Sequence, residues 1–468
     1  MKKNILIVTL VISTLFFAVA YAAELINSKD ISFSNGATNL SSNNVQDAIE
    51  ELYDKTVSDS SCKNVSAPKL GEGLVPVTIE NDGTVKFADT SKSWYNYCDK
   101  IWANAVILED GTNYKVGDTI QESDIQSYFV WIPKYKYKLW NVDVAVENAH
   151  EIEIVFDETN TTDFEGVSCK TPMTSGGSGN CNNGEYMTHP AFISMNTNGF
   201  WVGKYETGYK GATSTAAAQV NANDTSKIII KPNVYSWRNI SVYNAFLNSY
   251  NYQRNLESHM MKNTEWGAVA YLSHSKYGKN AEININNNSN YKTGYSALPS
   301  TNQQTMSGES GDGVSYNSAY NTTIGYKAST TGNINGIYDM SGGAAEYVSN
   351  YISGVPGSSG FSTTTLANYD NKYFDLYNSS SNTTTFQYRI LGDATGEMGP
   401  FKLYLDGDNI SRYHTSWNTD YSYFVSSSSS WLNRGGSYIN GAIAGAFYFH
   451  SYNGGNYNSV GFRIVLTP

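Results

Sequence analysis

The sequence predicts an α+β fold in which long irregular loops are held on short strands and two helices, preceded by a short helix and a small β-rich unit. Runs of β-branched and aromatic residues are short, and glycine, asparagine and serine interrupt them throughout. In the large C-terminal part, only residues 236–252 and 264–272 space their large apolar residues as helices do. The polar stretches 213–226, 283–316 and 353–385 are expected to be loops, because they contain too little apolar surface to form a core.

Composition sets the broad class of the protein. The chain has 468 residues, enough for roughly two to four domains of ordinary size. Its 31 basic and 42 acidic residues give a net charge of −11, so it lacks the positive field that nucleic acid or anionic lipid needs. Aromatic residues make up 14%, whereas disordered chains are poor in them. We therefore expect a folded protein with no nucleic-acid partner.

Residues 1–22 have the pattern of a signal peptide. Lys2 and Lys3 precede an apolar run over 5–20, and Ala-Tyr-Ala at 20–22 places small residues where a signal peptidase cuts. This pattern predicts export, and so a secreted or cell-surface protein. The apolar run is somewhat long for a signal peptide, and an uncleaved membrane anchor is the alternative.

The state of the four cysteines follows from that location. Outside the cytosol thiols are mostly paired, and four cysteines allow three pairings. We favour Cys62–Cys98 and Cys169–Cys181, because each pair closes a short loop. Four free cysteines are the alternative.

Residues 23–60 are expected to form a helical stalk. Within 44–53 the apolar side chains gather on one helical face, and a residue among 41–43 can cap the helix. The face consists of Val45, Ala48, Ile49 and Leu52. A single short helix is marginal in water, so this face needs a partner, either elsewhere in the chain or in an oligomer through the same helix of another subunit. The segment resembles parts of phage fibres and exported surface proteins.

Residues 61–128 are expected to form the small β-rich spacer. Asn-Asp-Gly-Thr at 81–84 predicts a hairpin turn between strands at 77–79 and 85–87. Four large aromatic residues lie close together in the same unit: Trp94, Tyr95, Tyr97 and Trp102. They form either a packed core or a stacking surface, and a small unit favours the core.

The remaining residues, 129–468, contain six short motifs. They are FVWIP at 129–133, GFWVGKYE at 199–206, TEW at 264–266, GIYDMSG at 336–342, RGGS at 434–437 and GFR at 461–463. Together, in this order, they resemble the formylglycine-generating-enzyme-like domain, or sulfatase-modifying factor domain, a branch of the C-type lectin fold. The resemblance implies two helices and a small twisted sheet that hold irregular loops. Chemistry has to be argued separately.

Two arginines and a glutamate are expected in the core of this domain. Arg434 and Arg463 are expected to make buried hydrogen bonds to carbonyls or to an acid such as Glu346. The resemblance also implies a structural calcium site over SGGAAE at 341–346, where Gly343 replaces the family's asparagine. Glu346 is then the remaining side-chain ligand for calcium, and pairing with an arginine in the core is the alternative.

The resemblance argues against catalysis as well. Formylglycine formation in the family uses a reactive cysteine pair between the RGGS-like and GFR-like segments, and residues 434–463 contain no cysteine. The iron branch needs clustered histidines, and the six histidines here show no close pair at helical spacing. We therefore expect no enzyme and no cofactor other than calcium. A divergent oxidoreductase of the same fold is the alternative.

The segment between the last two motifs, 438–459, has the composition of a binding surface. Tyrosine offers a large contact area at low entropic cost, and asparagine, serine and glycine add adaptable hydrogen bonds. In a strand, Phe447 and Phe449 would face the core, and Tyr448 and His450 the solvent. The candidate ligand-binding residues are Tyr438, Asn440, Tyr448, His450, Tyr452, Asn456 and Tyr457, with Trp417 and Trp431 as flanking anchors. This arrangement looks like that of variable proteins of diversity-generating retroelements.

These patterns together predict an exported, non-catalytic ligand-binding or adhesion protein. Its C-terminal segment would contact an unknown surface protein or glycan. A structural subunit of a surface or phage-derived fibre, assembled through residues 44–53, is a further alternative.

Overall fold

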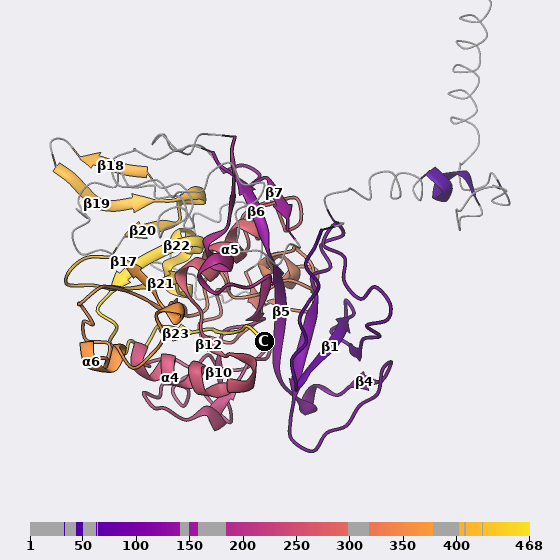
Figure 1. The fold of residues 1–468 in the computed structure, drawn as a ribbon, viewed down its shortest axis with the longest axis horizontal. Helices are drawn as coiled ribbons and strands as arrows, with labels where there is room; N and C mark the ends of the chain where they lie inside the picture. Colours follow the sequence, from indigo (N-terminus) through magenta and orange to yellow (C-terminus); the bar gives the residue numbers. More distant parts are fainter. Residues whose placement is uncertain are drawn as a thin grey trace, which may run out of the picture. The chain divides into compact units, whose positions relative to one another are not determined.

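The computed structural model describes residues 32, 44–49, 62, 64–140, 149–157, 184–297, 318–377, 402–406, 409–423 and 425–468, and over 402–406 and 409–415 it describes the backbone only. The chain divides into two units, Met1–Lys63 and Asn64–Pro468. Within the second unit strands are many and helices are few and short (Figure 1). This content confirms the predicted α+β class.

An eight-stranded antiparallel sheet runs through the second unit in the order β12-β24-β9-β5-β3-β1-β2-β4. Its strands are β1 (Leu74–Ile79), β2 (Val85–Phe87), β3 (Asn104–Leu108), β4 (Thr119–Ile120), β5 (Ile125–Pro133), β9 (Gly199–Gly203), β12 (His259–Met260) and β24 (Ile464–Leu466). The central strands β5 and β9 are buried along almost their whole length. Trp131 of β5 lies opposite Trp201 of β9, with ring centroids 5.3 Å apart. These large side chains form the core of this sheet.

Strands β1 to β4 belong to this sheet, so residues 61–128 do not form a separate spacer. The boundary expected between residues 128 and 129 lies inside β5, and β3 pairs with β5 along its length. The sequence pattern shows where strands occur but not which strands pair, and that is why the boundary was misplaced. The predicted hairpin is confirmed: Ile79 pairs with Val85, and the turn between them closes with an amide-to-carbonyl hydrogen bond of 2.9 Å.

The second sheet has seven strands in the order β18-β19-β20-β22-β21-β15-β23 (Figure 1). Its strands are β15 (Ala345–Tyr347), β18 (Lys402–Asp406), β19 (Asn409–Thr415), β20 (Tyr421–Tyr423), β21 (Trp431–Gly435), β22 (Gly445–Tyr452) and β23 (Val460–Phe462). The pairs β20–β22 and β15–β23 are parallel and the others antiparallel. Arg463 alone separates β23 from β24, so the chain passes directly from this sheet into the eight-stranded one.

Both predicted helices exist, but one is shorter than expected. The segment 264–272 corresponds to α5 (Asn263–Ser273), whose residues are all buried. The other helix, α4 (Val242–Tyr252), begins six residues later than predicted, because the Ser241 hydroxyl caps it by accepting the Asn244 amide at 3.4 Å. The residues before this cap are not helical.

The remaining elements are short. They are α3 (Pro190–Ser194), α6 (Thr363–Leu366), β6 (Tyr135–Lys138), β7 (Ile154–Phe156), β8 (Tyr186–Thr188), β10 (Gly208–Tyr209), β11 (Ile228–Ile229), β13 (Tyr295–Ser296), β14 (Ser318–Ala319), β16 (Asn350–Ile352) and β17 (Asp375–Tyr377). Strands β6, β7 and β8 form a three-stranded sheet, and the other strands form pairs.

One predicted loop contributes to the core. The expectation for 353–385 was a polar loop, yet Phe361 and Phe374 within it are buried. Their rings lie 5.4 and 4.9 Å from that of Phe246 on α4. The segment has a low content of apolar residues, but a few large rings within it pack against helix α4.

In the first unit, residues 45–49 are helical. The Asn44 side chain caps this turn, because its Oδ1 accepts the Asp47 amide at 2.8 Å. The predicted helix is confirmed over these residues, with Asn44 rather than one of 41–43 as its cap. The predicted signal peptide, 1–22, lies outside the described residues. No helix in the described part of the chain has the length and apolar character needed to cross a bilayer.

Cys62 and Cys98 are disulfide-bonded, which confirms this pairing. Cys169 and Cys181 lie outside the described residues. Their pairing therefore stays a prediction.

Candidate ligand-binding surface

Partly exposed aromatic rings line one face of the seven-stranded sheet. We call the group formed by Tyr421, Tyr423, His450, Tyr452 and Tyr457 the tyrosine face. The His450 ring stacks 5.3 Å from that of Tyr421 and 5.6 Å from that of Tyr423. The Tyr452 ring meets those of His450 and Tyr457 edge-on at 4.7 and 4.8 Å. Four of the five rings lie on β20 and β22, which are side by side (Figure 1), and Tyr457 after β22 continues the row.

Strand pairing explains which residues reach this face. β20 and β22 are parallel, with Tyr423 opposite His450 and Ser422 opposite Phe449. Side chains at opposite positions point to the same side of a sheet, and successive side chains alternate. Phe447 and Phe449 accordingly point into the core, where both are buried. The predicted alternation is confirmed for these two residues.

Tyr448 is not a solvent-facing residue, in contrast to the prediction. It is only 5% exposed. The Tyr421 ring lies 5.9 Å away, and a Cβ on Gly436 would come within 3.2 Å of the Tyr448 ring. The turn formed by the RGGS motif therefore packs closely against this tyrosine, and burial raises the pKa of its hydroxyl.

Trp431 and Trp417 are core residues rather than flanking anchors. The Trp431 indole is fully buried, donates to the Pro356 carbonyl at 2.8 Å and stacks on Phe361 at 5.9 Å. The Trp417 ring is 2% exposed and stacks on Trp140 at 5.5 Å. Neither indole offers a free face in this arrangement, because other aromatic rings occupy it.

Tyr438 and Asn440 belong to another element, the short 3-10 helix η10 (Tyr438–Ile443). The Asn440 Oδ1 accepts the Ser437 amide at 2.7 Å, so this side chain caps the turn. The Tyr438 ring meets that of Tyr291 edge-on at 4.8 Å. Both predicted residues are therefore partly exposed on η10, but they do not belong to the tyrosine face.

The sequence pattern did not single out Tyr421 and Tyr423, although both belong to the tyrosine face. They lie before the RGGS motif, and only the parallel pairing of β20 with β22 brings them beside His450. The alternation Tyr-Ser-Tyr at 421–423 is the signal that could have identified them. Asn456 is exposed next to Tyr457, as predicted for a contact residue, and donates to the Asn239 side chain at 3.1 Å.

Arg434 supports the tyrosine face from the core side of the sheet. Its guanidinium donates to the Tyr448 carbonyl at 2.8 Å and to the Asn263 side chain of α5 at 2.8 Å. Arg434 is fully buried. The expected structural role of the RGGS arginine is therefore confirmed, and β22 is tied to α5 through it.

Arg463 and Glu346 form a buried ion pair. The Arg463 Nε donates to one carboxylate oxygen at 2.8 Å and its Nη2 donates to the other. Its Nη1 also donates to the Gly203 carbonyl of β9 at 2.7 Å. The pair thus joins β15 of one sheet to β9 of the other. Because both carboxylate oxygens face the guanidinium, Glu346 is an arginine partner, which was the alternative expected beside a calcium ligand.

Gly343, which stands where the resemblance places an asparagine, has no room for a side chain. Its φ is +68°, and a Cβ there would lie 2.1 Å from Glu206 Oε1. Glu206 is buried and its Oε1 accepts the Ala344 amide at 2.8 Å. Its carboxyl therefore occupies space that an asparagine side chain would need.

Three buried acids lie close enough to influence one another. Burial raises the pKa of Glu206 and of Asp339, and it raises the pKa of Glu346 to about 7 although Arg463 opposes this shift. Among the residues with described side chains, no group of three or more histidine, cysteine or acidic side chains is arranged to hold a metal. The acids are embedded in hydrogen bonds and a single ion pair.

His450 is the one titratable imidazole of the tyrosine face. Burial lowers the pKa of this imidazole to about 4. The imidazole is therefore neutral at physiological pH. A neutral ring can stack on Tyr421 and Tyr423 without the cost of burying a charge.

Comparison with known proteins assigns no family to the chain. No protein-family model matches the chain, and none of the curated proteins matches it. Among solved structures, the Major Tropism Determinant I1 Variant is 12% identical, with a TM-score of 0.28 over 86% of this chain and 74% of that one. Treponema denticola variable protein 1 is 10% identical, with a TM-score of 0.27 over 73% of this chain and 96% of that one. Likenesses of this size carry no argument about the fold or the ligand of this chain.

Proposed function

We propose that this chain is an exported, non-enzymatic adhesion protein that binds a surface protein or glycan through the tyrosine face. The scaffold would be a C-type lectin fold of the formylglycine-generating-enzyme-like branch, as the six motifs indicate. The observation that carries the proposal is the row of five partly exposed rings, which is supported from below by buried Arg434.

The composition of this face suits recognition better than catalysis. Tyrosine rings contribute apolar contact and a hydroxyl at the same time. The rings touch one another, so little side-chain freedom remains to be lost when a partner binds. The face contains no cysteine, and the pKa of its histidine is too low for acid–base work near neutral pH.

The test is a binding screen of the purified full chain against arrays of glycans and of cell-surface proteins. A variant with Tyr423, Tyr452 and Tyr457 all replaced by alanine should lose binding to every partner found. Tyr235→Ala, which removes a partly exposed ring outside the face, should leave binding unchanged. Equal binding by the triple variant would overturn the proposal.

The oxidoreductase alternative has its own measurement. The full chain would be incubated with a cysteine-containing peptide, copper and oxygen, and the peptide would be examined for an aldehyde by mass spectrometry. We expect no conversion, because residues 434–463 lack the cysteine pair of the family. Aldehyde formation would replace the binding proposal with an enzymatic one.

The finer proposal is that the C-terminal segment is diversified by a retroelement. Its gene would then lie near a reverse transcriptase and a near-identical template repeat of the sequence that encodes residues 438–459. Mismatches between the two copies should fall at adenines of the template. Absence of both neighbours would remove the diversification but not the binding function.

A further inference from the structure

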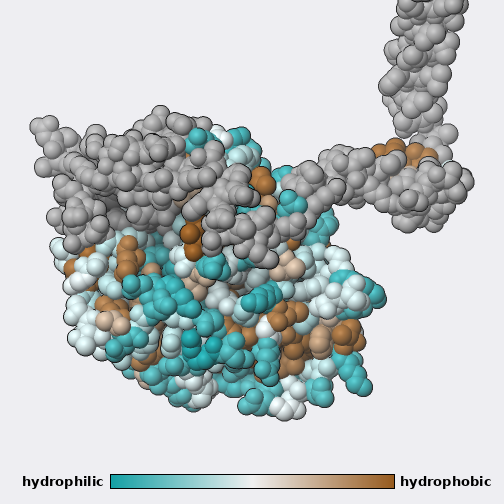
Figure 2. Space-filling model, in the orientation of Figure 1, coloured by the Kyte–Doolittle hydropathy of each residue, from teal (hydrophilic) through white to brown (hydrophobic). Residues whose placement is uncertain are grey.

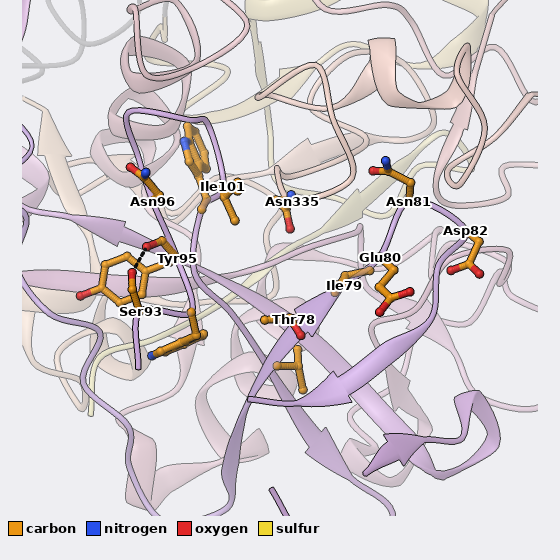
Figure 3. A pocket seen from close by; sticks show the side chains of 13 residues that line it. Thr78, Ile79, Glu80, Asn81, Asp82, Ser93, Tyr95, Asn96, Ile101 and Asn335 are labelled. Atoms are coloured by element: carbon orange, nitrogen blue, oxygen red, sulfur yellow. Dashed lines mark hydrogen bonds between the residues drawn. The ribbon is translucent and has the colours of Figure 1, made fainter. Parts of the chain in front are cut away.

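A cleft of about 760 Å³ opens beside the eight-stranded sheet. Its walls come from the end of β1 with the following hairpin turn, from the loop over 93–102, and from Asn335 (Figure 3). In Figure 1 β1 and β20 lie on opposite sides of the second unit, so this cleft is separate from the tyrosine face. Its volume is in the range of small-molecule sites, about 300–1,000 Å³.

The four aromatic residues that lie close together at 94–102 fall into two pairs at this cleft. Tyr97 and Trp102 are buried, and the Trp102 indole donates to the Tyr277 carbonyl at 2.9 Å. Trp94 and Tyr95 are partly exposed and line the cleft, with their rings perpendicular and 5.4 Å apart. One pair therefore supports the wall, and the other pair offers ring surface to a ligand.

The polar lining is rich in uncharged groups. They are the side chains of Thr78, Asn81, Ser93, Asn96 and Asn335. Figure 3 shows Asn335 pointing toward Thr78 across the cleft. The two carboxylates in the lining are those of Glu80 and Asp82. The Glu80 carboxylate pairs with Lys86, and hydrogen bonds from Thr84 lower the pKa of Asp82. No lysine or arginine is among the lining residues, so the two carboxylates are the charged groups that line the cleft.

The loop that carries the rings is held in place. The amides and carbonyls of Asn96 and Ile101 bond to each other in both directions at 2.8 Å, and Cys98 between them is disulfide-bonded. The Tyr97 hydroxyl donates to the Trp131 carbonyl in the core at 2.7 Å. A wall fixed in this way loses little conformational entropy when a ligand binds.

We propose that this cleft binds a neutral sugar. The apolar face of a pyranose ring can lie against Trp94 or Tyr95, while its hydroxyls exchange hydrogen bonds with the Ser93 hydroxyl and with the amide of Asn335 in the middle of the cleft (Figure 3). A ligand with both an apolar face and many hydroxyls matches a lining of half-exposed rings and uncharged amides. The inference does not depend on the tyrosine face, since no residue is shared.

The experiment titrates the purified full chain with the methyl glycosides of glucose, galactose, mannose and N-acetylglucosamine, followed by ligand-observed NMR. At least one should bind saturably. Trp94→Ala should weaken that sugar about tenfold, because a stacked aromatic face is lost. Asn335→Ala, which removes the amide that faces the middle of the cleft, should also weaken it. Thermal unfolding of each variant checks that the chain is still folded.

Two controls separate the cleft from its surroundings. Lys92 comes just before the loop 93–102 and is not among the lining residues. The Lys92→Ala variant should therefore bind sugar as the unmodified chain does. Tyr452→Ala on the tyrosine face should do the same, so failure of the proposed function and failure of this inference can be distinguished. Absence of saturable binding by all four glycosides, or sugar binding unchanged by both Trp94→Ala and Asn335→Ala, would overturn the proposal. Binding of tetramethylammonium or glucose 6-phosphate in place of the neutral sugars would overturn it too.

Discussion

The two sheets use their aromatic residues in opposite ways. In the eight-stranded sheet, β5 and β9 bury Trp131 and Trp201 with almost no alternation along the strands. In the seven-stranded sheet, β22 alternates: it buries Phe449 and leaves His450 and Tyr452 partly exposed. A strand buried on both faces cannot change without disturbing the core, whereas an alternating strand can change on one face. The first sheet therefore acts as the frame, and the second has a face that is available for contact. On the face drawn in Figure 2, apolar patches are scattered among hydrophilic and intermediate residues.

The largest effect is expected where the two sheets are joined. Arg463→Met would leave the Glu346 carboxyl buried without its partner and would remove the donor to the Gly203 carbonyl. We expect a loss of about 3–5 kcal/mol in the free energy of unfolding. Urea denaturation of the full chain measures it. A loss below about 1 kcal/mol would mean that the two sheets are held together without this pair.

The second prediction compares two tyrosines of the C-terminal segment. Tyr448→Ala should cost about 3 kcal/mol, because it leaves a cavity beneath the Tyr421 ring. Tyr457→Ala should cost less than about 1 kcal/mol, since this ring is partly exposed. Both values come from urea midpoints of the single variants. Equal costs would show that the face is packed as tightly as the core.

Gly343→Asn tests whether the missing asparagine can be restored. The new Cβ would lie too close to Glu206 Oε1 at a positive φ, so we expect a loss of about 1–3 kcal/mol. Thermal unfolding with and without millimolar calcium measures this loss. Calcium should not stabilise the variant, because Glu346 remains paired with Arg463. A calcium-dependent rise in the melting temperature would contradict our assignment of Glu346.

The smallest expected effect is a change with pH. Because burial holds the pKa of His450 near 4, the unfolded chain, with a usual value of about 6.5, takes up a proton first as the pH falls. The stability that the neutral ring contributes is thus complete above about pH 6.5 and is lost as the pH falls toward 4.

The matched variant is His450→Gln, which does not titrate. From pH 7 to pH 5 the unmodified chain should lose roughly 1–2 kcal/mol more than the variant in the free energy of unfolding. Glu346 has a raised pKa and acts in the opposite direction, but it is present in both proteins and cancels in the difference. If the free energy of unfolding changed equally with pH in the two proteins, the pKa of His450 would not be lowered by burial as we infer.

Local patterns were reliable where one short interaction decides the structure. The turn at 81–84 forms as predicted because Gly83 adopts a φ of +94° and two strands of alternating residues flank it. The burial of Phe447 and Phe449 follows from alternation alone. By contrast, the exposure of Tyr448, Trp417 and Trp431 could not be predicted, because it depends on rings that arrive from distant segments, such as Phe361 above Trp431.

The sequence by itself determined the α+β class, the hairpin, helix α5 and the structural role of the two motif arginines. These features depend on neighbouring residues, on strong backbone preferences or on a charge that has to be matched once buried. Only the tertiary structure decided that β1 to β4 extend the central sheet, that Tyr421 and Tyr423 join His450, and that Trp94 and Tyr95 open onto a cleft. The physical reason is that strand order and burial are set by contacts between segments far apart in the chain, and no local pattern records which segments meet.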